Sequence, residues 1–534
     1  MPTIYNFEAK SIQNYILDSS KLKDMIGASE QIEYLCCDNG LLDKVLSSIK
    51  NANTQFVRKA GGAFTIIFSK LDDAKRFQAV WTFCVQQAFP GLNFVQGIGE
   101  NKDWKQAIEF ADKEFKKDDH NHLLLTFPLA GALVARSPRT GQPAVSQSKK
   151  LGERLDAITK HKREFRKSKL LIEKLKFDTP VDWPINLKNK DKEDEDETCF
   201  PLLKDNNYIG IIHADGNNLG QLLKALKKQL RENTQLTESD YAERLMAFSK
   251  AIETANIKSA RKAIKNEKIV KAASNNFRTM PARPLVLGGD DLTFIVRGDL
   301  ALNFAKQFLE EFEKNTKTEF ESLTEKYSDL KKCLPEKLTA CAGIAYIKAS
   351  QPFHQGYELA ESLCQHAKSF SKNRLSKNKL IPSSVAFRRI TTSIINSYEA
   401  ILEDELIIGN SIQITMQPYL VGEVKPTKTS NCVYLEHLQD LYQLLKDNEV
   451  SQGIFREILS LLEINRSLAE QAMRRWYDNM EKRQQQDLLI QLKEIFEKMG
   501  FDKQPQDSLQ FIGSEIEKFE RTPIGDVLAL IKVG

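Results

Sequence analysis

Apolar and polar residues follow a pattern that predicts one arrangement of elements twice along the chain. In the clearer copy, the apolar run 208–215 is typical of a buried strand, and a helical pattern follows it after a Gly-Asn-Asn turn. A second helical pattern covers 241–255. Two short apolar strands then flank Gly288, Gly289, Asp290 and Asp291, which have the spacing of a tight hairpin. A helix, a strand and a last helix complete this copy; these segments are 300–316, 339–347 and 354–370.

The first copy repeats this order in a degraded form. Its segments are 4–17, 55–59, 63–68, 71–83, 92–99 and 103–115. Its hairpin reads Gly61-Gly62-Ala63-Phe64 in the place of Gly288-Gly289-Asp290-Asp291, so both acids are missing. Aligning Ala111 with Ala360 also places Asp119 where the second copy has Lys368. We therefore expect the first copy to be structural or ligand-binding and not catalytic.

This order of elements is that of the palm of polymerases and nucleotide cyclases. The predicted fold class is α+β, with two ferredoxin-like palm domains, the first of them degenerate, and an α-helical domain at the C-terminus. A chain of 534 residues is too long for one core. The predicted domains are the first palm (1–130), a charged linker or helical insertion (131–204), the catalytic palm (205–400), and a connecting strand with the helical domain (401–534).

The composition shows no bias typical of a disordered, collagenous or secreted chain. The hydrophobic fraction of 41% and charged fraction of 28% are those of a globular chain, and the net charge of +5 is small for its length. The eight cysteines lack zinc-site spacing, and neither a signal peptide nor a membrane span is recognisable, so a cytoplasmic protein without membrane partners is expected. The basic stretch 136–176 fits phosphate contact or simple solvation, and the acidic run 191–197 is predicted to be a solvated linker.

The candidate chemistry lies at Asp215, which ends the first strand of the second copy, and at Asp290 and Asp291 on the hairpin. Nucleotidyl transfer needs two divalent metals held by converging carboxylates, and hard oxygen ligands suit Mg²⁺ or Mn²⁺. These three acids are the predicted catalytic and metal-binding residues. The predicted nucleotide-binding residues are Gly288 and Gly289, which admit substrate close to the backbone, Gly216, Asn217 and Asn218 at a helix start, and Lys368. Lys368 fits a solvated helix lysine nearly as well, and His213 is interpreted as packing.

The motifs of this chain resemble those of the large polymerase-cyclase subunit of type III CRISPR effector complexes. The motifs lie at 7–35, 211–220, 283–296 and 342–368, with weaker similarity at 383–393 and 415–423. The resemblance implies that ATP binds the second palm, that two Mg²⁺ or Mn²⁺ ions bind its acids, and that a ribose 3′-hydroxyl attacks the α-phosphate of another ATP. The product would be a cyclic oligonucleotide, expected to be cyclic oligoadenylate, and the partners guide or target RNA and small CRISPR subunits.

Departures from the family pattern qualify these expectations. The chain has no His-Asp dipeptide and begins in the first palm, so DNA cleavage is not expected, and a reduced or stand-alone relative fits its length. The family's cysteine-ligated zinc module is missing, and Asn217 replaces an acid that is common after the Asp-Gly pair. A catalytically weak, RNA-binding scaffold subunit and a cyclic dinucleotide synthase are therefore alternatives. A homodimer is also possible, because a palm site can be completed by a second palm.

The last hundred or so residues predict a helical domain, because apolar residues recur at helical spacing. Within it, 474–477 (Arg-Arg-Trp-Tyr) fits nucleic-acid contact through stacking and charge. A face that binds a partner or packs against the domain itself is the other interpretation.

Overall fold

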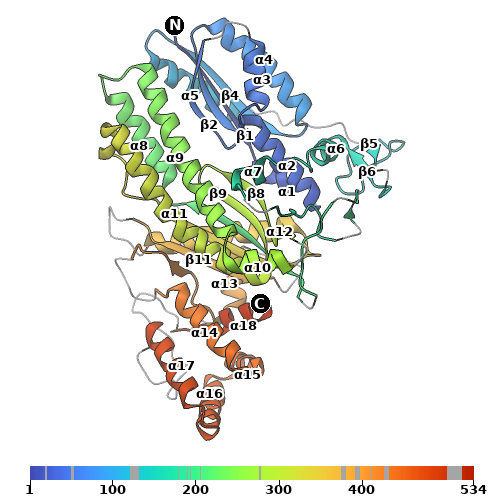
Figure 1. The fold of residues 1–534 in the computed structure, drawn as a ribbon, viewed down its shortest axis with the longest axis vertical. Coiled ribbons are helices and arrows are strands. Elements are labelled where there is room, and N and C mark those ends of the chain that lie inside the picture. Colours follow the sequence, from blue (N-terminus) through green and yellow to red (C-terminus); the bar gives the residue numbers. More distant parts are fainter. Residues whose placement is uncertain are drawn as a thin grey trace. The chain divides into compact units, whose positions relative to one another are not determined.

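The first copy of the repeat forms a four-stranded antiparallel sheet in the computed structural model of the chain. Its strands are β1 (Thr3–Lys10), β2 (Thr54–Ala60), β3 (Ala63–Phe68) and β4 (Asn93–Glu100), in the order β2-β3-β1-β4. Helices α4 (Leu71–Ala88) and α5 (Trp104–His120) pack on it (Figure 1). Alternate residues of β1 point into an aromatic core around Phe64 and Trp81, which are at most 1% exposed. Helices α1 (Ile12–Leu17), α2 (Leu22–Cys36) and α3 (Leu41–Ser48) connect β1 to β2.

The structure describes residues 1–18, 21–49, 53–120, 131–148, 150–177, 180–188, 191–192, 194–195, 197–204, 206–275, 278–373, 380–390, 397–409, 412–425, 432–501 and 520–533. Parts of four segments discussed above lie outside these residues, namely 19–20 of the first motif, 149 of the basic stretch, 193 and 196 of the acidic run, and 391–393 of a weaker motif. In the described part of the chain, no helix is long and apolar enough to cross a membrane.

The second copy forms a six-stranded sheet in the order β14-β11-β10-β7-β9-β8. Its strands are β7 (Tyr208–Gly216), β8 (Ala282–Gly288), β9 (Asp291–Arg297), β10 (Ala340–Lys348), β11 (Ser383–Arg389) and β14 (Tyr419–Val421). Its helices are α8 (Leu219–Glu232), α9 (Glu238–Ile264), α10 (Glu267–Asn275), α11 (Gly298–Lys326) and α12 (Phe353–Asn373). The mixed α and β palm architecture is confirmed, and the predicted elements occur in the predicted order, with α10 as an additional helix before β8. Helix α11 runs ten residues further than its predicted end.

The chain divides into two units. One contains residues 1–201, 218–294 and 314–338, and the other contains 202–217, 295–313 and 339–534. Each unit consists of three separate stretches of the chain, and the strands and helices of the second palm belong partly to one unit and partly to the other. The domain limits inferred from the sequence therefore stay a prediction.

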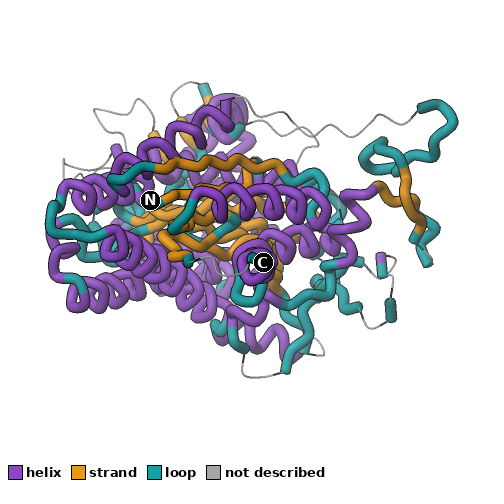
Figure 2. The backbone as a smooth tube through the Cα atoms, turned by 90° about the horizontal axis from the view of Figure 1, so that it is seen from above, coloured by secondary structure: helices purple, strands orange, loops and turns teal. Residues whose placement is uncertain are grey.

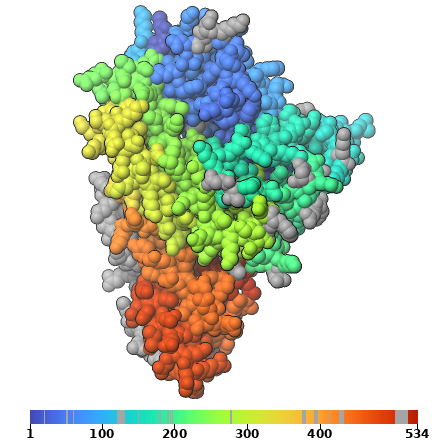
Figure 3. All heavy atoms as spheres, viewed as in Figure 1, coloured from blue at the N-terminus to red at the C-terminus, as the bar shows by residue number. Residues whose placement is uncertain are grey.

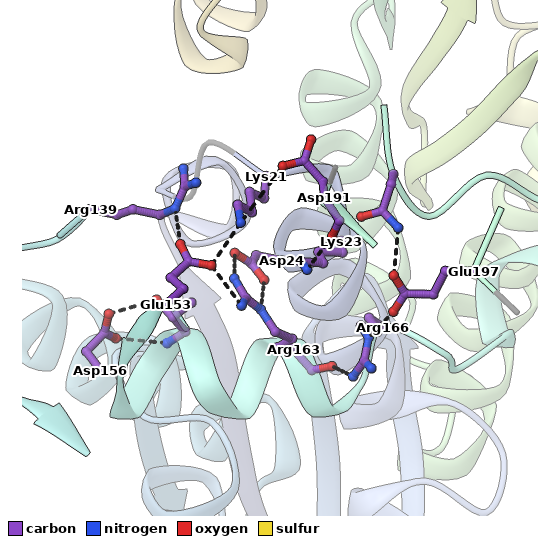
Figure 4. Close-up of polar contacts among 12 residues, drawn as sticks. Lys21, Lys23, Asp24, Arg139, Glu153, Asp156, Arg163, Arg166, Asp191 and Glu197 are labelled. Carbon is purple, nitrogen blue, oxygen red and sulfur yellow. Dashed lines mark hydrogen bonds and ion pairs between the residues drawn. The ribbon is translucent and has the colours of Figure 1, made fainter. Parts of the chain in front are cut away.

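The segment after the first palm is joined to α2 and to Lys21, the residue before this helix, by ion pairs. It contains β5 (Ala144–Gln147), β6 (Arg154–Asp156), α6 (Ala157–Glu164) and α7 (Leu170–Leu175). Its β5–β6 hairpin stands away from the strands in Figure 2, whereas α6 packs on α2. Arg163 donates two hydrogen bonds of 2.7 and 2.8 Å to Asp24, and Glu153 accepts from Lys21 at 2.8 Å (Figure 4). Figure 3 shows this segment in teal beside the blue first palm.

Part of the acidic run is buried, which corrects its interpretation as a solvated linker. Glu197 is 1% exposed and accepts hydrogen bonds from Arg166 at 2.8 Å and from Asn186 at 2.7 Å. Asp194 accepts from the same guanidinium at 2.8 Å. The acids of this run therefore neutralise Arg166 and Lys167 of the basic stretch.

The C-terminal region is helical, as predicted, with short strands. Its elements are α13 (Tyr398–Glu405), β12 (Ile407–Ile408), β13 (Ile412–Gln413), α14 (Leu435–Asp447), α15 (Gln452–Ile464), α16 (Arg466–Lys482), α17 (Gln486–Lys498), β15 (Glu520–Arg521) and α18 (Ile524–Val533). Tyr477 is fully buried, and Trp476 packs on Phe455 with ring centroids 5.3 Å apart. These two aromatic residues therefore pack within the helical region itself, which is one of the two interpretations of this segment.

Candidate functional site

Asp215 lies at the end of β7, a strand whose side chains are otherwise largely buried. Strand β7 pairs antiparallel with β10 and also neighbours β9. Residues 209–214 are buried on both faces, as expected for an apolar run inside a sheet, whereas Asp215 is half-buried. The end of the strand thus brings one carboxylate to the sheet edge while the apolar run fixes its position.

The Gly-Gly-Asp-Asp segment forms the predicted hairpin between β8 and β9. Its two-residue turn is Gly289–Asp290, and Gly289 has a φ of 59°, a conformation that favours glycine. Asn256 of α9, which is 0% exposed, donates hydrogen bonds of 3.0 Å to the carbonyl oxygens of both Gly289 and Asp291. One buried amide therefore holds both sides of the turn. Sequence reasoning missed this residue, because an asparagine inside a helical pattern carries no signal of its long-range partner.

The three predicted acids come together. Carboxylate oxygens of Asp215, Asp290 and Asp291 lie within 4.8 Å of one another, and all three residues are half-buried. Two metals in nucleotidyl-transfer sites lie about 3.5 to 4 Å apart, so a cluster of this size suits them. The donor atoms are hard carboxylate oxygens, which fit Mg²⁺ or Mn²⁺ and not a soft metal.

Lys368 of α12 reaches the first of these acids. Its ammonium forms an ion pair with the Asp215 carboxylate and donates a hydrogen bond of 3.1 Å to the Gly216 carbonyl. Burial lowers the pKa of Lys368, but the Asp215 carboxylate more than offsets this, so the pKa is raised and the lysine stays charged. Lys368 is therefore not a freely solvated helix lysine. Its contact with phosphate stays a prediction.

The turn between β7 and α8 has the predicted helix start, with Asn218 as the N-cap at a φ of 60°. Asn217, however, is 5% exposed and faces inward. Its backbone N–H donates to the Thr339 carbonyl at 2.8 Å, and its side-chain amide donates to the Thr339 hydroxyl at 2.9 Å. Both donors are used inside the protein, so Asn217 fixes the end of β7. Its predicted contact with nucleotide, and those of Gly216 and Asn218, stay predictions.

His213 is buried, in agreement with its interpretation as packing. Its ring lies 5.5 Å from that of Tyr357 at 70°. Burial lowers the pKa of His213 to about 4, although the Asp215 carboxylate acts in the opposite direction. Because His213 is neutral at pH 7, it adds no charge to the cluster formed by the three acids and Lys368.

Close contacts between glycine and helix show how the two palms correspond. A Cβ atom on Gly97 of β4 would lie 2.6 Å from the carbonyl oxygen of Ala111 in α5. A Cβ atom on Gly343 of β10 would lie 1.9 Å from the carbonyl oxygen of Ala360 in α12. In each palm a glycine thus allows the last helix to approach the sheet at the same point. The alignment of Ala111 with Ala360 made from the sequence is geometrically supported.

This correspondence reveals an acid that sequence reasoning missed. Gly97 pairs with Asn6 and Gly343 pairs with His213, so Glu8, two residues further along β1, is the counterpart of Asp215. Lys10 lies 3.0 Å from Glu8 and 3.7 Å from Asp119, the counterpart of Lys368. The first palm therefore keeps a carboxylate on its first strand but neutralises it with a lysine of the same strand.

The hairpins correspond with a shift of one residue from the sequence alignment. The turn of the first palm is Gly61–Gly62, with φ of 60° and 77°, and matches the turn Gly289–Asp290. Ala63 is therefore the counterpart of Asp291, and Gly62 that of Asp290. Both acids are missing from the first hairpin in either alignment, so a two-metal site cannot form there.

A cavity of ≈ 280 Å³ adjoins the Gly-Gly-Asp-Asp hairpin. Its wall contains residues 288–291, the β1 and β3 face of the first palm, and apolar residues of α8 and α9. The cations Arg58 and Lys227 also line it, and burial lowers the pKa of Lys227. Gly288 and Gly289 thus face a space with an apolar wall and polar groups, the usual make-up of a small-molecule site.

Comparison with known proteins gives one family match within the second palm. Residues 208–376 match the family described as Cas10/Cmr2, second palm domain, which confirms for this segment the resemblance that its motifs indicate. No curated protein matches the chain in sequence.

Solved structures similar to the chain include the apo Csm1-Csm4 cassette, Csm1 in T.onnurineus, and the Csm1-Csm4 cassette in complex with cA4. The apo cassette is 12% identical with a TM-score of 0.46, and the match covers 100% of this chain and 69% of that one. Csm1 in T.onnurineus has the same identity and coverages with a TM-score of 0.45. The cA4 complex is 14% identical with a TM-score of 0.41; the match covers 73% of this chain but only 54% of that one.

Proposed function

We propose that this protein is a metal-dependent nucleotidyltransferase that makes a cyclic oligonucleotide, cyclic oligoadenylate, from ATP in CRISPR-type antiviral defence in the cytoplasm. The observation that carries the proposal is the convergence of three half-buried carboxylates at the hairpin and strand end of a palm sheet. The family match over residues 208–376 supports the same reaction class.

Asp215, Asp290 and Asp291 would hold two Mg²⁺ or Mn²⁺ ions, which supply charge stabilisation for the attacking and leaving oxygens. In the reaction, a ribose 3′-oxygen forms a bond to the α-phosphorus of ATP, and the bond from that phosphorus to the pyrophosphate oxygen breaks. The hydroxyl proton leaves to solvent. Lys368 adds a fixed positive charge beside Asp215. Asn256 keeps the hairpin carboxylates in place through its two backbone hydrogen bonds.

The cavity beside the hairpin is the proposed place for a nucleoside. Its apolar wall from α8 and α9 suits a base, and the absence of side chains at Gly288 and Gly289 leaves room for a ribose near the carboxylates. Guide or target RNA and small CRISPR subunits are proposed partners through the family resemblance, and a homodimer stays possible.

The test is incubation of the purified protein with Mg²⁺ or Mn²⁺ and each nucleoside triphosphate, with products resolved by mass spectrometry. We expect cyclic oligoadenylate and pyrophosphate from ATP, and neither from the Asp290→Ala plus Asp291→Ala double variant. A matched control is Asp72→Ala plus Asp73→Ala, which removes two adjacent acids from the first turn of α4 and should keep activity. Equal activity in both double variants would refute the proposal.

The same experiment separates the alternatives. Products from GTP alone would favour a cyclic dinucleotide synthase. Bound RNA without turnover would favour the scaffold. The sequence feature behind the scaffold alternative is the missing acid at Asn217, a residue whose side chain is buried and donates to the Thr339 hydroxyl.

A further inference from the structure

A second cavity, of ≈ 510 Å³, lies around α7 in the segment that follows the first palm. Residues 166–169 before the helix and residues 176–177 and 180–183 after it contribute to its wall, and Arg283 of β8 reaches it from the palm sheet. Helix α7 packs on β8 (Figure 1), and Asp182 extends the contact by exchanging backbone hydrogen bonds of 2.9 and 2.8 Å with residues 278 and 280. The cavity is therefore built on the strand that leads to the catalytic hairpin.

Arg283 is the unusual group in this cavity. Its side chain is 3% exposed, and its Nε atom has no hydrogen-bond partner among the described residues. The nearest acid is Glu30, whose Oε1 lies 3.8 Å from the guanidinium and is itself without a hydrogen bond. The other oxygen of Glu30 accepts from the Ser168 hydroxyl at 3.1 Å and from the Leu170 N–H at 2.8 Å.

The charge of Arg283 is thus compensated at a distance but not hydrogen-bonded. Burial lowers the pKa of Arg283 to about 10, with the Glu30 carboxylate acting in the opposite direction. A buried guanidinium with an unused donor is costly, and an acceptor oxygen entering the cavity would relieve that cost. The unused Nε–H donor at this position is the first observation that points to an anion-binding site.

The rim of the cavity carries further cationic side chains. Lys169 and Lys176 are exposed lining residues, and neither has an ion pair in the described part of the chain. Two acids, Glu173 and Asp182, also line the rim, while Arg166 is committed to Asp194 and Glu197. In the described part of the chain, the two lysines at the mouth are therefore cations without an ion pair, whereas Arg283 at the base is paired with Glu30 but keeps an unused Nε–H donor.

Aromatic rings stand at the same mouth. Trp183 and Phe177 are half-buried, with ring centroids 6.5 Å apart at 90°. Tryptophan beside unpaired cations is the combination on which bases stack while their phosphates meet positive charge. The volume also falls in the range of about 300 to 1,000 Å³ that is usual for small-molecule sites.

We propose that this cavity binds a nucleoside phosphate, with Arg283, Lys169 and Lys176 meeting the phosphate and Trp183 meeting the base. The ligand is either a free nucleotide or one nucleotide of single-stranded RNA, which share this chemistry. It is a site separate from the three carboxylates. Because Arg283 lies five residues before Gly288 on one strand, an occupied cavity stiffens the strand that carries the catalytic hairpin. This last consequence rests on the proposed function; the binding itself does not.

The test is titration of tryptophan fluorescence in the Asp290→Ala plus Asp291→Ala background with EDTA, so that metal-dependent binding is removed. The ligands are AMP, a six-residue oligoadenylate RNA, and adenosine as the phosphate-free control. We expect AMP or the RNA to change the tryptophan fluorescence and adenosine to bind much more weakly. In Trp183→Phe, the fluorescence change on adding ligand should be lost. Saturation by AMP identifies a free nucleotide, and saturation by the RNA alone identifies RNA.

Arg283→Met removes the buried donor while keeping much of the shape, and should weaken binding by about tenfold or more, the factor typical for one charge-assisted hydrogen bond. Arg154→Met is the matched control, because Arg154 is an exposed arginine of β6 outside the cavity. If Arg283→Met does not fold, the exposed pair Lys169→Ala plus Lys176→Ala replaces it. Binding unchanged in the cavity variants, equal binding of adenosine, or no fluorescence change with any ligand would overturn the proposal.

Discussion

Asn256 should be the residue outside the acid cluster on which turnover depends most strongly. Its buried side-chain amide donates to the carbonyl oxygens of Gly289 and Asp291, one on each side of the residue Asp290. Replacing it with leucine keeps the size of the side chain but removes both donors. The two carbonyl groups then lose their common partner, and the turn is free to move.

The magnitude follows from those two hydrogen bonds. Each contributes about 1 kcal/mol net, and a buried carbonyl left without a partner costs about 1 to 3 kcal/mol. We therefore expect Asn256→Leu to lower the free energy of unfolding by about 2 to 4 kcal/mol. The effect on turnover should be larger than that on folding, because a displacement of about 1 Å in a catalytic group costs about a hundredfold in rate.

The assay compares pyrophosphate release per folded molecule with the urea unfolding curve. Asn315→Leu is the matched control. Asn315 is a half-buried asparagine of α11, and it donates a hydrogen bond of 3.0 Å to Ser259, which lies in α9 like Asn256 but does not bond to the hairpin. It should lose about 1 kcal/mol of stability and keep its turnover. Wild-type turnover per folded molecule in Asn256→Leu would refute the positioning role, as would equal loss in the control.

Three other predictions concern Lys368, His213 and Gly27. Lys368→Met frees the Asp215 carboxylate, so Mn²⁺ measured by electron paramagnetic resonance should bind about threefold more tightly, the value of a partly exposed ion pair, while turnover falls; weaker Mn²⁺ binding would contradict this. The pKa of His213 is about 4 in the folded state, below its ordinary value near 6.5, so its stabilising effect is complete above pH 6.5 and is lost as pH falls towards 4. Urea midpoints at pH 7 and pH 5 should differ less in His213→Phe than in the parent, and an equal difference would contradict the assignment. Gly27→Ala places a Cβ atom 1.7 Å from a carbonyl oxygen of α6 and should lower the melting temperature, whereas Gly220→Ala, with no atom within 4 Å, should not; a stable Gly27→Ala would show that α2 and α6 can separate freely.

The sequence by itself determined the strands and helices that define the two palms, although not α2, α3 or α10, and it determined the place of the acids. Apolar runs and helical spacing are local properties, so the strand ending at Asp215 and the hairpin carrying Asp290 and Asp291 follow from residues close in the chain. Once the order of elements indicated a palm, convergence of these three carboxylates followed from topology. The degeneracy of the first palm was visible in the same way, from a hairpin without acids.

The tertiary structure decided which polar groups serve the site, because their partners lie far away in sequence. Asn217 looks like part of a phosphate loop but is used by Thr339, 122 residues later. Asn256 looks like any helical asparagine but holds the hairpin, and Glu8 is recognisable as the counterpart of Asp215 only through strand register. A hydrogen bond or a buried charge depends on which surfaces meet, and no local pattern encodes that. The same holds for Arg283, whose unused donor exists only because α2, α7 and β8 close around it.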